Sequence, residues 1–194
     1  MERELVVSGI GGQGVQLAAS VLAHAAVAEG CTVQVFGSYG GMMRGGATEA
    51  TVVVGEGPVE SPPTISSAWS AILMHHQFAE HALSCLGPAS VALVNTTVFE
   101  HRLDTTPGTV IAVPAAAMAL ELGNAMAGSM VMVGAYVAVT GIVGLPALLA
   151  AACAALPSYR AQHVELNARA IEAGYNAAPR LAAPAWTAQH GTQS

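Results

Sequence analysis

The sequence predicts an α/β protein, a Rossmann-like three-layer fold with a mostly parallel sheet and a helical C-terminal part. Three observations support this. Short valine-rich segments alternate with longer segments rich in Ala and Leu, which is typical of parallel strands joined by helices. A glycine-rich loop follows the first apolar segment and precedes the first helical one. From residue 114 to residue 173 the pattern is that of successive helices.

Six strands are predicted in the first part of the chain. Residues 4–8 form a short apolar run that ends in glycines, as a buried parallel strand does. Residues 48–54 alternate threonine and valine, which also favours a strand. The other strands are predicted at residues 32–36, 71–74, 90–94 and 109–113.

Helices are predicted between and after these strands, and most begin or end at a recognisable signal. Glu29 and Gly30 end the first one, and Pro114 and Pro146 suit first helical positions. One domain is therefore expected over residues 1–176, followed by an Ala/Pro/polar tail, 177–194, that is disordered or bound to a partner. The predicted helices span residues 15–29, about 76–86, 114–122, 129–143, 146–156 and 159–173.

Charge is scarce in this chain of 194 residues. Only 9% of residues are charged, against roughly 25% in ordinary soluble proteins. The six basic residues are all Arg and the net charge is −6, which argues against nucleic-acid binding and against a basic membrane-docking patch. Either a partner covers much of the surface or part of the chain lies in lipid.

The membrane alternative rests on the uncharged segment 128–144, which is long enough to consider as a span. Gly123 and Asn124 before it, Pro146 after it, and the lack of flanking Lys or Arg all argue against a span. A helix buried in a subunit assembly explains the segment better. The N-terminus lacks the features of a signal peptide, so a cytoplasmic location is expected.

Cysteine and histidine give no sign of a metal site or of nucleophilic catalysis. The three cysteines are far apart and form no CxxC, whereas a cysteine-ligated iron–sulfur cluster needs four thiolates. His75, His76 and His81 do not have the spacing of ligands on one helical face. We therefore predict no metal-binding and no catalytic residue.

The first glycine loop reads Gly9-Ile10-Gly11-Gly12-Gln13-Gly14 and matches G-x-G-x-x-G between a strand and a helix. Such a loop lies at the carboxyl end of its strand and allows a phosphate to reach the N–H groups of the following helix. An NAD enzyme should also have an acid at the end of the second strand, and residues 32–38 contain none. Phosphate contact and subunit packing therefore both remain open.

The second loop reads Ser38-Tyr39-Gly40-Gly41-Met42-Met43-Arg44-Gly45-Gly46. Arg44 is suited to bidentate recognition of a phosphate or carboxylate, and the glycines allow a close backbone approach. Because this loop follows the second strand, we expect it to lie beside the first.

Together the two loops resemble the gamma subunit, the domain III equivalent, of 2-oxoacid:ferredoxin oxidoreductases. Family members have a G-x-G-G-Q-G loop and then an S-Y-G-x-x-x-R-G-G loop. Two later segments also match, through Gly123, Asn124, Met130 and Gly134, and through Asn167, Ala170, Gly174 and Tyr175. The resemblance covers about residues 3–176. Ser129 departs from it, since many members have Asn there. Met42-Met43 also replaces a proline–acid pair of the 2-oxoglutarate type and is similar to the indolepyruvate type.

The resemblance implies a non-redox subunit of an enzyme that oxidatively decarboxylates a 2-oxoacid to an acyl-CoA and passes electrons to ferredoxin. A 2-oxoglutarate-type substrate is favoured, with indolepyruvate or phenylglyoxylate as aryl alternatives. Thiamine diphosphate, Mg and iron–sulfur clusters belong to the alpha, beta and ferredoxin-like partner subunits. This chain contributes to assembly and contacts coenzyme A or substrate. The residues implied in binding are Gly11, Gly12, Gln13, Gly14, Ser38, Tyr39, Arg44, Gly45, Gly46 and Asn124.

Two other classes of function remain to be compared with this one. A stand-alone Rossmann protein that binds NAD or FAD predicts tight nucleotide binding by the isolated chain, and the missing acid argues against it. A membrane-associated helical subunit predicts a chain that needs detergent, and the α/β pattern before residue 113 argues against that.

Overall fold

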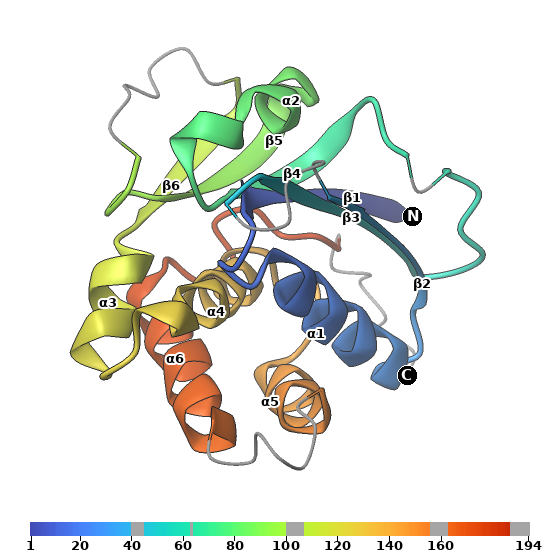
Figure 1. Ribbon diagram of the computed structural model, residues 1–194. Coiled ribbons are helices and arrows are strands. Elements are labelled where there is room, and N and C mark those ends of the chain that lie inside the picture. Colours follow the sequence, from blue (N-terminus) through green and yellow to red (C-terminus); the bar gives the residue numbers. More distant parts are fainter. Residues whose placement is uncertain (40–44, 63, 100–106, 156–162, 187–194) are drawn as a thin grey trace.

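The computed structural model describes residues 1–39, 45–62, 64–99, 107–155 and 163–186. They form one α/β unit in which helices cover a six-stranded sheet (Figure 1). The strands are β1 Glu2–Ile10, β2 Thr32–Tyr39, β3 Ala47–Gly55, β4 Ala68–Leu73, β5 Leu86–Asn95 and β6 Thr109–Val113. The helices are α1 Val15–Ala28, α2 Glu80–Ser84, α3 Ala115–Glu121, α4 Gly128–Thr140, α5 Leu145–Ala154 and α6 Val164–Ala177, with 3₁₀ turns η1 His76–Phe78 and η2 Ala125–Ala127.

The sheet is mostly parallel, as predicted, but it contains one reversed strand. Its order is β2-β3-β1-β4-β5-β6, and β1, β4, β5 and β6 pair in parallel. β3 is antiparallel to both of its neighbours, β1 and β2. A parallel β2–β3 pair would need a crossover of a dozen or more residues, and residues 40–46 are too few for one.

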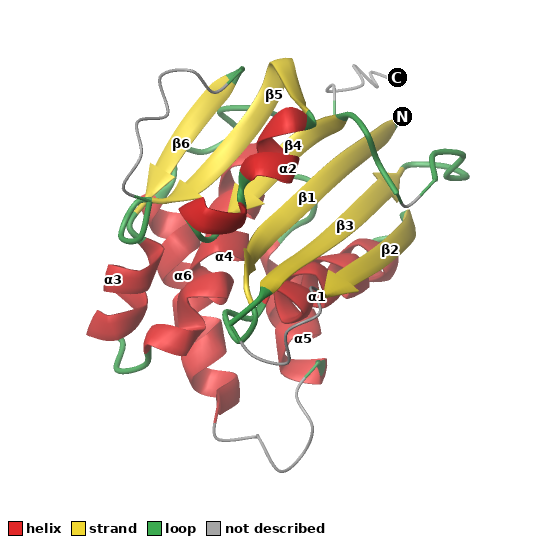
Figure 2. Ribbon diagram, turned by 45° about the horizontal axis from the view of Figure 1, so that its top comes forward, coloured by secondary structure: helices red, strands yellow, loops and turns green. Residues whose placement is uncertain are grey.

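The two faces of the sheet are covered unequally. Helices α1, α4, α5 and α6 lie on one face, whereas α2 lies on the other (Figure 2). The continuous helix predicted over residues 76–86 is wrong: this segment forms η1 and the five-residue α2, and Leu86 already begins β5. Part of this short segment runs back along the sheet and leads the chain to the start of β5. The other predicted helices and strands occur with shifted ends.

Helix α4 is the centre of the helical layer, and all 13 of its residues are buried. Its last carbonyl groups have no partner within the helix and accept hydrogen bonds from the C-terminal segment 178–186 instead. Leu181 N donates to Ala138 O at 2.8 Å and Ala185 N donates to Thr140 O at 2.7 Å. The described part of the expected tail therefore lies on this chain, while residues 187–194 lie outside the described residues.

The uncharged segment 128–144 thus forms a helix buried by its own chain, followed by a turn. Among the described residues, none of the helices combines the length and the apolar character that crossing a membrane requires.

Candidate ligand-binding cleft

The two glycine loops lie side by side, as the sequence predicted. Gly11 N, just after β1, donates to Gly46 O in the second loop at 2.9 Å. Gln13 points back toward the strand, where its Oε1 accepts from Ile10 N at 2.9 Å. Gly14 then begins α1 as its N-cap residue, with a left-handed φ of 79° that favours glycine.

A cleft of about 480 Å³ opens beside the first loop and brings several predicted residues together. Gly11, Gly12 and Gly14 line one side, and Asn124, from the turn before α4, lines the cleft as well. The other lining residues were not predicted as site residues. They are Val15, Gln16, Leu17, Thr48, Met126, Ala127, Ser129, His163 and Asn167.

The start of α1 gives the cleft its electrostatic character. Gly14 has no side chain to cap the helix, and the first turn contains no acidic residue. The N–H groups of such a turn point outward and carry the positive end of the helix dipole. No Lys, Arg, Asp or Glu is among the lining residues that the structure describes. Backbone N–H groups, uncharged polar side chains and His163 are therefore the groups available here to bind an anion.

Asn124 also has a local role, and the remaining predicted residues have other positions. The Asn124 side chain accepts from Met126 N at 2.9 Å and so begins η2. Gly45, with φ 74°, and Gly46 belong to the loop that contacts Gly11. Ser38 lines a neighbouring cavity. Arg44 and the side chain of Tyr39 lie outside the described residues.

Comparison with known proteins identifies the family. The model of the family described as pyruvate ferredoxin/flavodoxin oxidoreductase matches residues 4–177. The chain belongs to this family. Among its relatives is the 2-oxoglutarate synthase subunit KorC of Methanothermobacter marburgensis, 31% identical over 154 residues that cover 76% of this chain and 82% of the relative. Another is the pyruvate/ketoisovalerate oxidoreductases common subunit gamma of Thermococcus kodakarensis, 27% identical over 89% of this chain and 95% of the relative.

Solved structures agree with this assignment. The gamma subunit of a keto/oxoacid ferredoxin oxidoreductase from Geobacter sulfurreducens is 28% identical, with a TM-score of 0.78 over 91% of this chain and 95% of that one. The 2-oxoglutarate:ferredoxin oxidoreductase of Magnetococcus marinus shares the fold, with a TM-score of 0.80 at 17% identity over 92% of this chain and 32% of that one. The chain is a gamma subunit of a 2-oxoacid:ferredoxin oxidoreductase.

Complexes of this family use thiamine diphosphate and iron–sulfur clusters that other subunits hold. Cys31 precedes β2, Cys85 ends α2 and Cys153 lies in α5. Within the part of the chain that the structure describes, no three His, Cys, Asp or Glu side chains could hold a metal ion together.

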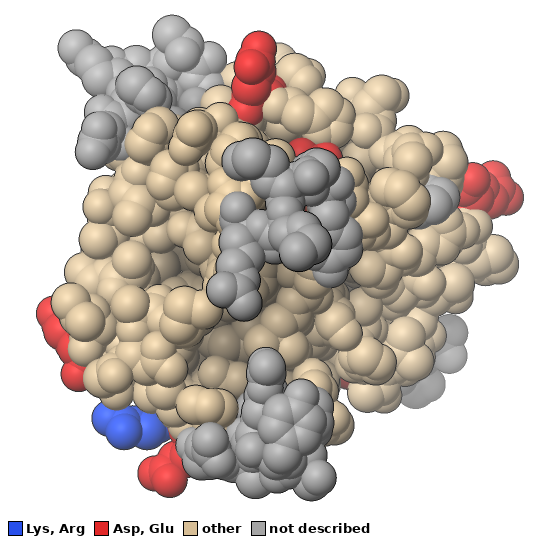
Figure 3. Space-filling model, viewed as in Figure 1, with Lys and Arg blue, Asp and Glu red and all other residues tan. Residues whose placement is uncertain are grey.

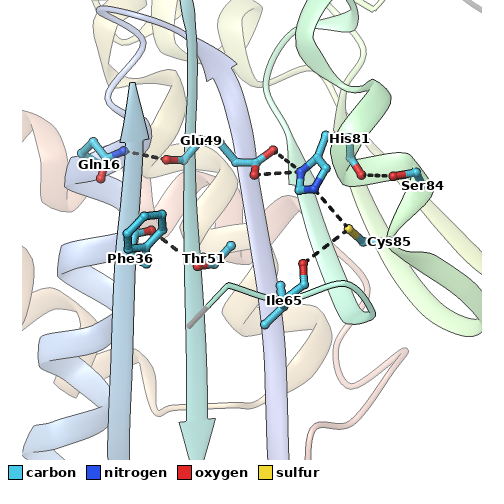
Figure 4. A network of polar contacts seen from close by, with 8 residues as sticks. All are labelled: Gln16, Phe36, Glu49, Thr51, Ile65, His81, Ser84 and Cys85. Atoms are coloured by element: carbon cyan, nitrogen blue, oxygen red, sulfur yellow. Dashed lines mark hydrogen bonds and ion pairs between the residues drawn. The ribbon is translucent and has the colours of Figure 1, made fainter. Parts of the chain in front are cut away.

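A second cavity in the gamma subunit, beside the cleft, contains a histidine–carboxylate contact that sequence reasoning missed. His81 Nδ1 lies 2.9 and 3.0 Å from the two carboxylate oxygens of Glu49 (Figure 4). Ser38 lines the same cavity. Gln16 Nε2 donates to Glu49 O at 2.8 Å and so connects this region to the cleft. Glu49 and His81 are 32 positions apart, and no sequence signal connects them.

Cys85 continues this network, since its Sγ lies 3.9 Å from His81 Nε2 (Figure 4). Carboxylate, imidazole and thiol therefore have the order of a catalytic triad. However, burial raises the pKa of the Cys85 thiol, and nearby Glu49 raises it further. This favours the thiol over the thiolate, and the network joins α2 to β3.

Proposed function

We propose that this gamma subunit serves an enzyme that oxidatively decarboxylates a 2-oxoglutarate-type acid to its acyl-CoA, with ferredoxin as electron acceptor. The alpha, beta and ferredoxin-like subunits supply thiamine diphosphate, Mg and the iron–sulfur clusters. The subunit names of the relatives from Methanothermobacter marburgensis and Methanocaldococcus jannaschii support the substrate class. The loop residues Met42-Met43 favour an aryl 2-oxoacid instead, and the experiment below distinguishes the two.

We also propose that the cleft contacts coenzyme A. The observation that carries this proposal is the uncapped start of α1, which opens into a cleft of about 480 Å³ beside glycines. A helix start of this kind binds phosphate through its N–H groups, and coenzyme A is the phosphorylated substrate of the reaction. The cleft contains no carboxylate among its described lining residues, so none of these residues repels an anion.

The test is steady-state kinetics of the assembled complex with Gly11→Ala in this chain. A Cβ at Gly11 would make only ordinary contacts, at 3.5 Å from Gly45 N and from Thr48 Oγ1, so the fold tolerates it while the loop wall becomes bulkier. We expect the KM for coenzyme A to rise about fivefold and the KM for the 2-oxoacid to stay unchanged. Among 2-oxoglutarate, pyruvate, indolepyruvate and phenylglyoxylate, 2-oxoglutarate should have the highest kcat/KM.

The matched control is Gly57→Ala, because nothing lies within 4 Å of a Cβ there and the residue is remote from the cleft lining. It should leave both KM values unchanged. An unchanged KM for coenzyme A in Gly11→Ala would refute the contact. A higher kcat/KM for an aryl acid would overturn the substrate class and leave the contact standing.

A further inference from the structure

Strand β2 forms one edge of the sheet and has a strand neighbour on one side only (Figure 2). It pairs with β3 through eight consecutive residues without a shift in register. Its hydrogen bonds to described residues all go to β3. About half of the backbone N–H and C=O groups of such a strand point away from its neighbour, and these groups are a template on which a further strand can pair.

The sequence of β2 lacks the features that keep an exposed edge from pairing with other chains. Edge strands are usually short, or they carry charges, proline or a bulge. β2 is eight residues long, contains no Lys, Arg, Asp, Glu or Pro, and has no bulge against β3. Val35 and Phe36 are 46% and 45% exposed there. The strand at the opposite edge, β6, has only five residues. We therefore expect another chain to cover the edge at β2.

An acidic groove lies beside this edge, on the face of the sheet that α2 partly covers. Two cavities of about 490 and 270 Å³ share Ser38, Glu49 and His81 in their linings, so they form one groove. Phe36 lines the smaller cavity and Glu80 lines the larger one. No Lys or Arg is among the described lining residues of either cavity. The two carboxylates therefore favour a cation in the groove.

The register of the sheet brings Glu49 within reach of a strand added to β2. Ser38 is the Cα partner of Glu49, so the two side chains lie on the same face. Neighbouring strands are about 4.8 Å apart and Ser38 is small, so a Lys or Arg opposite Ser38 can extend across it to the carboxylate of Glu49. That carboxylate contacts His81 Nδ1 (Figure 4), but it has about four lone-pair sites and can accept from a second donor.

We propose that an extended segment of another subunit of the complex pairs with β2 and places a Lys or Arg side chain in the acidic groove. Charge decides between this occupant and a second copy of the chain. A second copy paired through its own β2 brings no cation, because β2 contains no Lys or Arg. The net charge of −6 on each copy adds repulsion. The proposal depends on membership of a multisubunit oxidoreductase and stands whichever 2-oxoacid that enzyme uses.

Amide hydrogen exchange of the unaltered chain, alone and in the assembled complex, tests the strand pairing. The outward-facing amides of residues 32–39 should exchange at least about tenfold more slowly after assembly, because a paired N–H group exchanges only when the pairing opens. Unchanged exchange in this segment would overturn the proposal. Slow exchange in the isolated chain that becomes faster on dilution would identify a second copy as the occupant and overturn it as well.

The affinity of this chain for the remaining purified subunits is the second measurement. Val35→Lys places a charge on the edge and should weaken assembly at least about tenfold. Val27→Lys makes the same change in α1, at a side chain that is 58% exposed, and should have little effect. Glu80→Lys in the groove should weaken assembly about fivefold, whereas Glu172→Lys on α6 should not. Equal effects within the valine pair would refute the strand pairing, and equal effects within the glutamate pair would refute the cation.

Discussion

The contact between α4 and α6 and the start of α1 both depend on glycine, but for opposite reasons. A Cβ on Gly134 would overlap the carbonyl of Ile171, and a Cβ on Gly174 would overlap that of Val131. These glycines let two helix backbones touch. At Gly12, with φ +102°, nothing lies within 4 Å of a Cβ position, so this glycine permits the turn and leaves space.

The polar groups of the two regions differ in the same way. The carbonyls at the end of α4 are satisfied by the C-terminal segment 178–186, whereas the start of α1 has no capping side chain. Neither α4 nor the described lining of the cleft contains Lys, Arg, Asp or Glu, and the face in Figure 3 carries few charged side chains among the described residues. Scarcity of charge therefore accompanies packing in one place and ligand access in the other. A glycine motif in the sequence does not distinguish a glycine that allows close packing from one that leaves space for a ligand. The space around each Cβ position does distinguish them.

The largest expected effect comes from adding a methyl group where the backbones of α4 and α6 touch. Gly134→Ala or Gly174→Ala forces a methyl group into a backbone carbonyl that cannot rotate away, so each should cost about 3 kcal/mol or more of unfolding free energy. Urea unfolding of the full chain measures this. Gly57→Ala, which meets nothing within 4 Å, should change the midpoint little. A small loss at both helix positions would mean that α4 and α6 can move apart.

Much of the fold could be predicted because local patterns determine it. The valine-rich strands, the glycine loop at the end of β1 and the contact of the two loops all follow from sequence order and crossover geometry. The reversal of β3 could also have been read from the short link 40–46. The five-residue α2 could not, because the apolar pattern of residues 76–86 is compatible with a longer helix.

The cleft was only half predictable. Its glycines and Asn124 are motif residues, whereas Thr48 is an ordinary strand residue in the sequence. Ser129 was noticed only as a departure from the family pattern and Asn167 only as a match to it. Their place in the cleft lining depends on how β3, α4 and α6 pack together, which is a property of the packed structure. The low charge of α4 was likewise attributed to a partner subunit, but its own chain buries it.

An intermediate effect is expected at Gly14, where the two roles of glycine meet. Gly14→Ala imposes a left-handed φ of 79° on alanine and places its Cβ 2.5 Å from Ser129 Oγ. We expect a loss of about 1–2 kcal/mol, mostly from the backbone. Thermal unfolding of Gly14→Ala, Ser129→Ala and the double variant measures the coupling between the two sites. The double variant should recover part of the loss, and strict additivity would show that the hydroxyl group already moves aside.

The smallest effect compares two buried serines, one whose hydroxyl group is enclosed and one that lines the cleft. Ser8 Oγ is enclosed without a partner, so Ser8→Ala should stabilise the chain by about 1 kcal/mol. A loss of stability would instead indicate a buried water at Ser8. Ser129→Ala should change the stability of the chain little without ligand, because its hydroxyl group faces the cleft. With pyrophosphate added, unaltered protein should gain stability in proportion to the logarithm of ligand concentration over Kd, and Ser129→Ala should gain less. Equal gains in the two proteins would show that Ser129 does not bind the ligand.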